Sequence, residues 1–281
     1  MPYAAEISRS NPSCFLFLID QSASMEDPFG SDGTTKPKAD GVADAINRLL
    51  QDLVIKCAKS EGIRDYYHIG ILGYGGDDVT PAFVGDLTGQ DIVPVSKIAE
   101  SPARVEERTK KVDDGAGGFV EQSIKFPIWI DSVANGGTPM CQAMEQANKI
   151  LDKWTAEHPK AFPPVVIHIT DGESTDGDPK ELMEHLKTLK TKDGNVLLFN
   201  VHLSDNPNAT QLTFPDNPND LPDQYSQLLY EGSSVLTPFQ RKVAGEMGFE
   251  VSEKTHGFVL NADLPLVIQA LEIGTRPSNL R

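Results

Sequence analysis

The stretch FLFLIDQSASM (residues 15–25) decides the fold, because an apolar run stops abruptly and oxygen-bearing side chains follow it. The run FLFLI is too short for a helix and is typical of a strand that is buried on both faces. Asp20, Ser22 and Ser24 come next, at alternate positions. In an extended segment, residues two apart point to the same side, so these three side chains can face one point.

The rest of the chain alternates short apolar runs with helical patterns. Strands are predicted at residues 15–19, 68–72, 165–169 and 196–203, with a weaker edge strand at 124–130, interrupted by Pro127, and a short one at 259–260. Helices are predicted at residues 42–58, 139–154, 179–189 and 264–273. This alternation predicts an α/β fold, a doubly wound and mostly parallel sheet with helices on both faces. Ligands bind such sheets beyond the carboxyl ends of the strands.

Two segments interrupt the alternation without ending it. Residues 81–123 are rich in charge and glycine, and the sequence DDGAGG (residues 113–118) is typical of a turn between two strands. Residues 205–223 carry four prolines among Asp and Asn, which favours an irregular surface loop. Because the pattern resumes after each segment, we expect one domain, residues 1–281, with a core of about residues 14–275 and two insertions.

Composition excludes several classes of partner. The formal net charge of −16 argues against binding to nucleic acid or to an anionic membrane surface. The apolar run before Asp20 is far too short to span a membrane, and the first residues lack the features of a signal peptide. The three cysteines are widely spaced and form no CxxC pair, so we expect neither a disulfide framework nor a zinc site. The sequence therefore predicts a cytoplasmic protein.

Oxygen-bearing side chains follow three of the predicted strands. Besides Asp20, Ser22 and Ser24, Thr138 lies in NGGTPM (residues 135–140) and Asp171 in ITDGES (residues 169–174). Hard oxygen donors suit Mg²⁺, and also Mn²⁺ or Ca²⁺, rather than zinc. The glycines before Thr138 allow a close approach of the backbone, and the proline after it suits the first turn of a helix. If these strands are neighbours, the three loops meet at one edge of the sheet.

Taken together, these five residues resemble the metal-ion-dependent adhesion site of von Willebrand factor A domains. All five positions of that pattern are present in the right order, and the resemblance spans most of the chain. It implies that Ser22, Ser24 and Thr138 bind Mg²⁺ directly through their hydroxyls. It also implies that Asp20 and Asp171 act through bound waters or by holding those hydroxyls. The two insertions depart from a minimal domain of this family.

The resemblance also implies a function. Neutral hydroxyl ligands leave much of the positive charge of the ion uncompensated, so an open coordination position would favour a carboxylate from a partner. We therefore expect a non-enzymatic, cytoplasmic, metal-dependent protein-binding module whose protein partner supplies Asp or Glu. The alternative is an adaptor subunit of an enzyme assembly. Intracellular relatives in the family suggest that such an adaptor would work with an AAA+ ATPase or with a kinase–phosphatase stress-response system.

No set of residues predicts catalysis by this chain. A phosphatase of the haloacid-dehalogenase type needs a second aspartate where Ser22 stands. The glycines of GYGG (residues 73–76) suit turns better than a phosphate loop, because no clear helix opens after them. His168 and His202 lie within predicted strands, where we expect hydrogen-bonded structural histidines. Glu173, close to Asp171, is expected at the surface.

Overall fold

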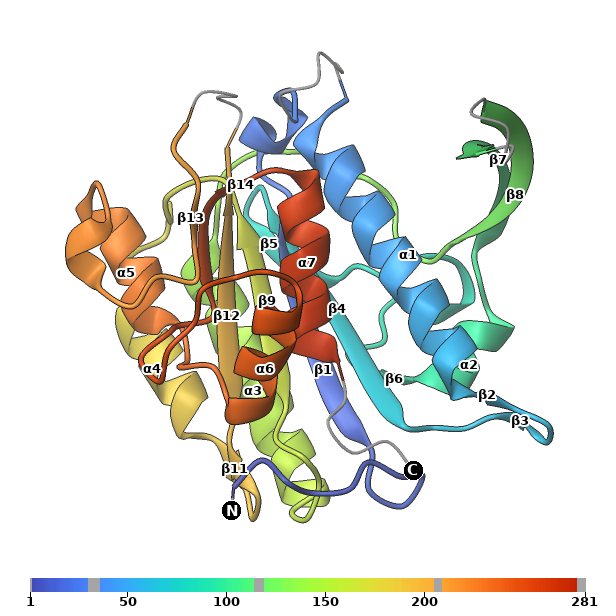
Figure 1. The fold of residues 1–281 in the computed structure, drawn as a ribbon, viewed down its shortest axis with the longest axis horizontal. Coiled ribbons are helices and arrows are strands. Elements are labelled where there is room, and N and C mark those ends of the chain that lie inside the picture. Colours follow the sequence, from blue (N-terminus) through green and yellow to red (C-terminus); the bar gives the residue numbers. More distant parts are fainter. Residues whose placement is uncertain (1, 30–35, 114–118, 205–208, 277–281) are drawn as a thin grey trace.

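The computed structural model describes residues 2–29, 36–113, 119–204 and 209–276 (Figure 1). Its main sheet has the strand order β13–β14–β12–β9–β1–β4–β5, with β6 paired to β4 as well. The strands are β1 (Ser13–Asp20), β4 (Tyr67–Gly75), β5 (Asp78–Pro81), β6 (Val93–Pro94), β9 (Val165–Thr170), β12 (Leu197–Leu203), β13 (Leu212–Thr213) and β14 (Phe258–Ala262). The pairings β4–β1–β9–β12–β14 are parallel, and β5, β6 and β13 are antiparallel at the edges. The predicted mostly parallel sheet is confirmed.

Helices pack on both faces of this sheet (Figure 1). One face carries α1 (Lys38–Cys57), α6 (Pro238–Glu246) and α7 (Leu264–Thr275). The other carries α3 (Met140–Glu157), α4 (Lys180–Thr188) and α5 (Gln224–Gly232). Every residue of β1 is buried, and its side chains alternate between the two cores, as in Phe17 on one face and Leu18 on the other. The predicted double winding is therefore confirmed.

The remaining short elements connect these layers. They are η1 (Ala23–Glu26), β2 (Ala58–Lys59), β3 (Gly62–Ile63), η2 (Gly85–Leu87), α2 (Val95–Glu100), β10 (Lys190–Thr191), β11 (Gly194–Asn195) and η3 (Pro218–Asp220). The segment 81–123 is more ordered than its composition suggests, since β6 joins the main sheet and α2 packs beside α1. The described part of the segment 205–223 contains β13 and η3, and residues 205–208 lie outside the described residues.

The order of the parallel strands changes direction beside β1. The chain runs from β1 to β4 on one side and then continues through α3 to β9 on the other side of β1. The two connecting helices, α1 and α3, lie on opposite faces of the sheet. A sheet with this reversal opens between the carboxyl ends of the two strands where the direction changes, which here are β1 and β9.

A hairpin of two long strands stands away from the main sheet (Figure 1). It consists of β7 (Arg104–Asp113) and β8 (Phe119–Ile128), paired antiparallel as a separate two-stranded sheet. We call it the arm. Its register corrects the prediction for residues 124–130: a strand is present but ends at Ile128, and it pairs with β7 instead of lining the edge of the main sheet. The turn predicted at residues 113–118 falls, apart from Asp113 at the end of β7, outside the described residues, between the two strands of the arm.

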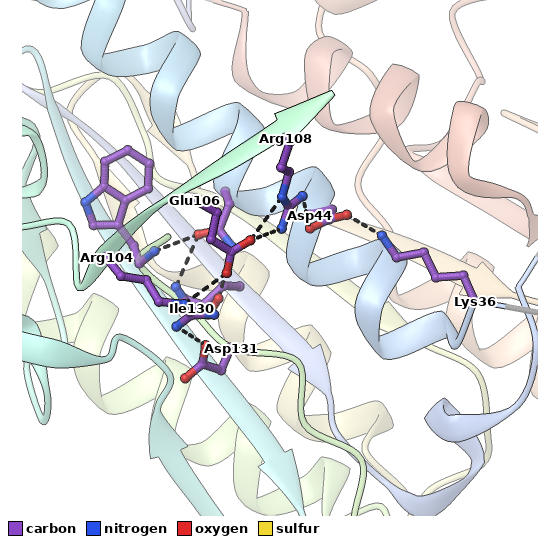
Figure 2. A network of polar contacts seen from close by, with 9 residues as sticks. Lys36, Asp44, Arg104, Glu106, Arg108, Ile130 and Asp131 are labelled. Carbon is purple, nitrogen blue, oxygen red and sulfur yellow. Dashed lines mark hydrogen bonds and ion pairs between the residues drawn. The ribbon is translucent and has the colours of Figure 1, made fainter. Parts of the chain in front are cut away.

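One ion pair links the arm to α1, and a second joins its base to Asp131, which follows β8 (Figure 2). Arg108 Nη1 lies 2.7 Å from Asp44 Oδ1 of α1, and its guanidinium also stacks 3.9 Å above the Phe126 ring. Arg104 Nη1 donates to Asp131 Oδ1 over 2.6 Å. The arm is therefore tied to α1 at Arg108 and to the segment after β8 at Arg104.

Candidate metal centre

The predicted metal-site residues lie at or just beyond the carboxyl ends of β1 and β9 and at the start of α3. Asp20 is the last residue of β1, and Asp171 directly follows the last residue of β9. The two strands are paired in parallel up to Ile19 and Ile169, so their following residues leave the sheet side by side. Thr138 lies at the end of the loop that precedes α3. The three loops meet at one edge of the sheet as expected, although the loop with Thr138 follows β8 of the arm and not a strand of the main sheet.

Four of the five predicted residues form one chain of contacts. The Ser22 N–H donates to Asp20 Oδ1 over 2.9 Å, and the hydroxyl oxygens of Ser22 and Ser24 are 3.0 Å apart. The Ser24 hydroxyl donates to Asp171 Oδ1 over 2.7 Å. The backbone differs from the fully extended segment that we expected, because a 3-10 turn that includes Ser24 begins at Ala23, while Ser22, its N-cap, is still extended. The turn still leaves the two serine hydroxyls adjacent.

Thr138 joins this group through its main chain. Its N–H donates to Thr175 Oγ1 over 2.9 Å, and its carbonyl accepts from the Thr175 N–H over 3.0 Å, which ties it to the loop after β9. The Ala23 N–H donates to the Gly136 carbonyl over 3.0 Å, which ties the same loop to the one after β1. Gly136 has φ +64°, and a Cβ there would lie 2.3 Å from Gly76 Cα. The predicted close approach of the backbone before Thr138 is confirmed at this glycine.

Asp20 is fully buried and its carboxylate is engaged within the chain. Oδ1 accepts from Ser22, as above, and Oδ2 accepts from the Thr170 hydroxyl over 2.8 Å. Burial raises the pKa of Asp20 to about 6, because the charged form is desolvated, and the hydrogen bonds from Ser22 oppose the rise. A carboxylate in this setting positions its neighbours and is not reachable from solvent.

Asp171 meets a buried lysine that the sequence reasoning missed. The Asp171 side chain is 0% exposed, and its Oδ2 lies 2.6 Å from Lys38 Nζ, whose side chain is only 4% exposed. Although the ammonium is this close, Asp171 Oδ2 makes no hydrogen bond of acceptable geometry with any described residue. Lys38 is the first residue of α1, well separated in sequence from Asp171. Such a long-range pair has no signature in local spacing.

Two tyrosines and Thr170 complete the surroundings of the site and were also missed. Thr170, the last residue of β9, is buried. The two tyrosines are Tyr74 and Tyr225, and burial raises the pKa of both hydroxyls. The Tyr225 hydroxyl of α5 donates to the Gly172 carbonyl, just after Asp171. The threonine before Asp171 was visible in the sequence as the last residue of an apolar strand, whereas nothing local pointed to either tyrosine. Exposed Glu173 lies at the surface, as expected.

The donor set fits a hard divalent cation. Two buried carboxylates and neighbouring hydroxyls supply only oxygen atoms, and Asp171 Oδ2 retains acceptor capacity. Within the described ranges, no three His, Cys, Asp or Glu side chains are placed so as to hold a metal ion. The predicted site is of a different kind, since it has two carboxylates and three hydroxyls. The residues that would hold Mg²⁺ are Ser22, Ser24 and Thr138, supported by Asp20 and Asp171.

In the part of the chain that the structure describes, no helix has the length and apolar character needed to cross a membrane.

Comparisons with known proteins identify no family. No family model matches the chain, and no curated protein matches it. Among solved structures, the chain is similar to the pilus adhesin RrgA from Streptococcus pneumoniae, with 14% sequence identity and a TM-score of 0.32. The match covers 61% of this chain and 22% of the adhesin, so the chain spans about a fifth of the length of that protein. A likeness at this level carries no argument about the site.

Proposed function

We propose that this chain is a cytoplasmic, metal-dependent protein-binding module of the von Willebrand factor A type. In this proposal Ser22, Ser24 and Thr138 hold Mg²⁺, or Mn²⁺ or Ca²⁺ in its place. A protein partner then contributes an Asp or Glu side chain. The observation that supports it best is the continuous chain of contacts from Asp20 through both serines to Asp171, at the switch point of the sheet.

Each residue has a distinct task in this proposal. Asp20 fixes the start of the loop by accepting a hydrogen bond from the Ser22 N–H, and Asp171 orients the Ser24 hydroxyl by accepting its hydrogen bond. The hydroxyl oxygens are then free to direct their lone pairs at a cation. Mg²⁺ bound there would supply a concentrated positive charge that attracts a carboxylate. The neighbouring loops would decide which protein brings that carboxylate.

Burial of Asp20 supports binding over catalysis. A phosphatase nucleophile must reach its substrate with one free carboxylate oxygen. Both oxygens of Asp20 accept hydrogen bonds from its own chain, and its side chain is fully buried. We therefore propose that the chain is a binding protein and not an enzyme.

Thermal unfolding with and without Mg²⁺ tests the proposal. A ligand that binds only the folded state stabilises it by about 2.7 kcal/mol at one hundred times its Kd. We expect Mg²⁺ to raise the Tm of the wild type, EDTA to reverse the rise, and Thr138→Ala to abolish it. Thr138 suits the test because its recorded contacts to neighbouring loops use the main chain, which the substitution keeps.

Thr188→Ala is the matched control, because this exposed threonine lies on α4 and its hydroxyl donates only to the nearby His185 carbonyl. The control should respond to Mg²⁺ as the wild type does. Equal stabilisation of Thr138→Ala and wild type by Mg²⁺ would refute the site.

Affinity capture in Mg²⁺ or EDTA, with wild type and Thr138→Ala as bait, then tests whether a protein partner binds through the metal. Capture that survives both EDTA and the substitution contradicts metal-dependent binding.

A further inference from the structure

Lys38 occupies an unfavourable place for a lysine. It is the first residue of α1, where the helix dipole disfavours a positive charge, and its side chain is 4% exposed. Removing an ammonium from water is costly unless a partner compensates it. Asp171 Oδ2, 2.6 Å away, is that partner, while Asp27 Oδ2 at 3.9 Å belongs to a half-exposed side chain. The lysine is therefore buried against one carboxylate.

That carboxylate is shared with the proposed metal site. Asp171 uses Oδ1 to accept from the Ser24 hydroxyl and presents Oδ2 to the Lys38 ammonium. We propose that Lys38 sets the metal affinity of the site, because its ammonium competes with the divalent cation for Asp171. This inference rests on the proposed function, since it concerns the same site.

Electrostatics gives the direction of the effect. Asp20 and Asp171 together carry two negative charges, and Lys38 offsets one of them. A buried ammonium a few ångströms from a divalent cation repels it, and burial weakens the screening by solvent. Without the lysine, both carboxylate charges are available to the cation. The affinity for Mg²⁺ should therefore rise when the ammonium is removed.

A purely structural role for the lysine makes a different prediction. The main chain at this helix start is already fixed, because the Lys38 N–H donates to the Asp27 carbonyl over 3.0 Å. If the ammonium served only the fold, its removal would lower stability by the same amount with and without Mg²⁺. If it competes with the cation, the loss should be confined to protein without Mg²⁺, where Asp171 is left without a countercharge.

Calorimetric titration with Mg²⁺ alone tests the inference on the full chain. The variant is Lys38→Met, and the control is Lys36→Met, which removes the same charge two residues earlier. Lys36 is partly exposed and pairs with Asp44 (Figure 2), whereas the partner of Asp171 is Lys38. We expect the Kd for Mg²⁺ to fall about tenfold or more in Lys38→Met and less than about twofold in Lys36→Met. An unchanged or higher Kd in Lys38→Met overturns the inference.

Thermal unfolding provides a second readout and guards against misfolding. In EDTA, Lys38→Met should unfold at a lower temperature than the wild type, and saturating Mg²⁺ should close this gap. A gap of the same size in both conditions overturns the inference.

If Lys38→Met does not fold, Lys38→Gln is the second variant, because it removes the charge and keeps a donor toward Asp171. Its Kd for Mg²⁺ must also fall below that of the wild type. If the wild type binds Mg²⁺ at least as tightly as these variants, this inference is refuted but the proposed function is not. Absence of Mg²⁺ binding by the wild type and by every variant refutes the proposed function as well.

Discussion

A row of buried polar side chains starts beside the site and crosses the sheet. The amide nitrogen of Asn200 donates to the Leu229 carbonyl, so its Oδ1 faces His168 Nδ1 at 2.7 Å. His168 Nδ1 must then carry the proton, and Nε2 accepts from the Tyr74 hydroxyl over 2.6 Å. These bonds fix one neutral tautomer of a fully buried ring. The expectation of a hydrogen-bonded structural histidine at this position is confirmed.

His168 should make the stability of the protein fall in mild acid. Burial lowers the pKa of His168 from 6.5 to about 4. Between these two values the unfolded chain binds a proton at this histidine and the folded chain does not, so stability rises with pH. The contribution is complete above pH 6.5 and is lost as the pH falls to about 4, at a cost of about 3 kcal/mol. Urea unfolding across this pH range measures the slope.

Two variants isolate this slope from the other titrating groups. His168→Gln keeps a polar side chain but cannot titrate, so its free energy of unfolding should depend less steeply on pH than that of the wild type. His185→Gln, at an exposed position of α4, should leave the slope unchanged. Parallel pH profiles for wild type and His168→Gln would contradict the assignment.

At the scale of single elements, a side chain of α1 makes hydrogen bonds to the backbone of residues 129 and 130, which a neighbouring strand would otherwise make. Asn47, in the middle of the helix, is 1% exposed. Its Nδ2 donates to the Ile130 carbonyl over 2.9 Å, and its Oδ1 accepts from the N–H groups of Trp129 and Ile130 at 2.8 and 3.2 Å. Trp129 and Ile130 directly follow β8, the second strand of the arm, and Ile130 is labelled in Figure 2. Asn47 thus fixes the segment that leads from the arm to the Thr138 loop.

Asn47→Ala should destabilise the fold by about 3 kcal/mol, because it leaves buried backbone groups of residues 129 and 130 without partners. Urea unfolding at neutral pH measures the loss. Asn195→Ala is the control, since this exposed side chain makes one hydrogen bond, to the Lys187 carbonyl, and should cost less than about 1 kcal/mol. Equal losses for the two variants would show that Asn47 contributes no more than a surface residue.

The helices differ in how far the sequence reveals them. α1, α3, α4 and α7 were predicted, because each repeats apolar residues at helical spacing over its core-facing side. The helices α5 and α6 were missed, although α4, which is also nine residues long, was predicted. Their start signals were nonetheless present. Thr237 and Gln240 form a capping box around Pro238, and Asp223 and Ser226 form a similar one before α5.

At the scale of the whole molecule, one sheet joins two cores. The same strand contributes Phe17 to the core beneath α1 and Leu18 to the core beneath α3. Disrupting either core therefore exposes β1 to water. We expect a single cooperative unfolding transition by calorimetry, with equal calorimetric and van't Hoff enthalpies. Two resolved transitions would contradict the proposal that the chain is one domain.

Long-range pairing limits what the sequence can reveal about the fold and the site. The parallel strands and the position of Asp20, Ser22, Ser24 and Asp171 follow from local patterns and from the rule that ligands bind at the carboxyl ends of strands. The contact of Lys38 with Asp171 and the separation of the arm from the main sheet depend on which distant segments meet. No local period encodes these meetings, so only the folded chain reveals them.

The arm has a consequence for the behaviour of the protein at high concentration. Within the described residues, β7 and β8 pair only with each other, so each strand has an unpaired outer edge, and Val105 and Val120 are 53% and 52% exposed. Such edges are templates for aggregation by strand addition from another molecule. The paired positions Glu107 and Lys125 carry opposite charges. Charged side chains on an open ribbon oppose the addition of a strand from another molecule.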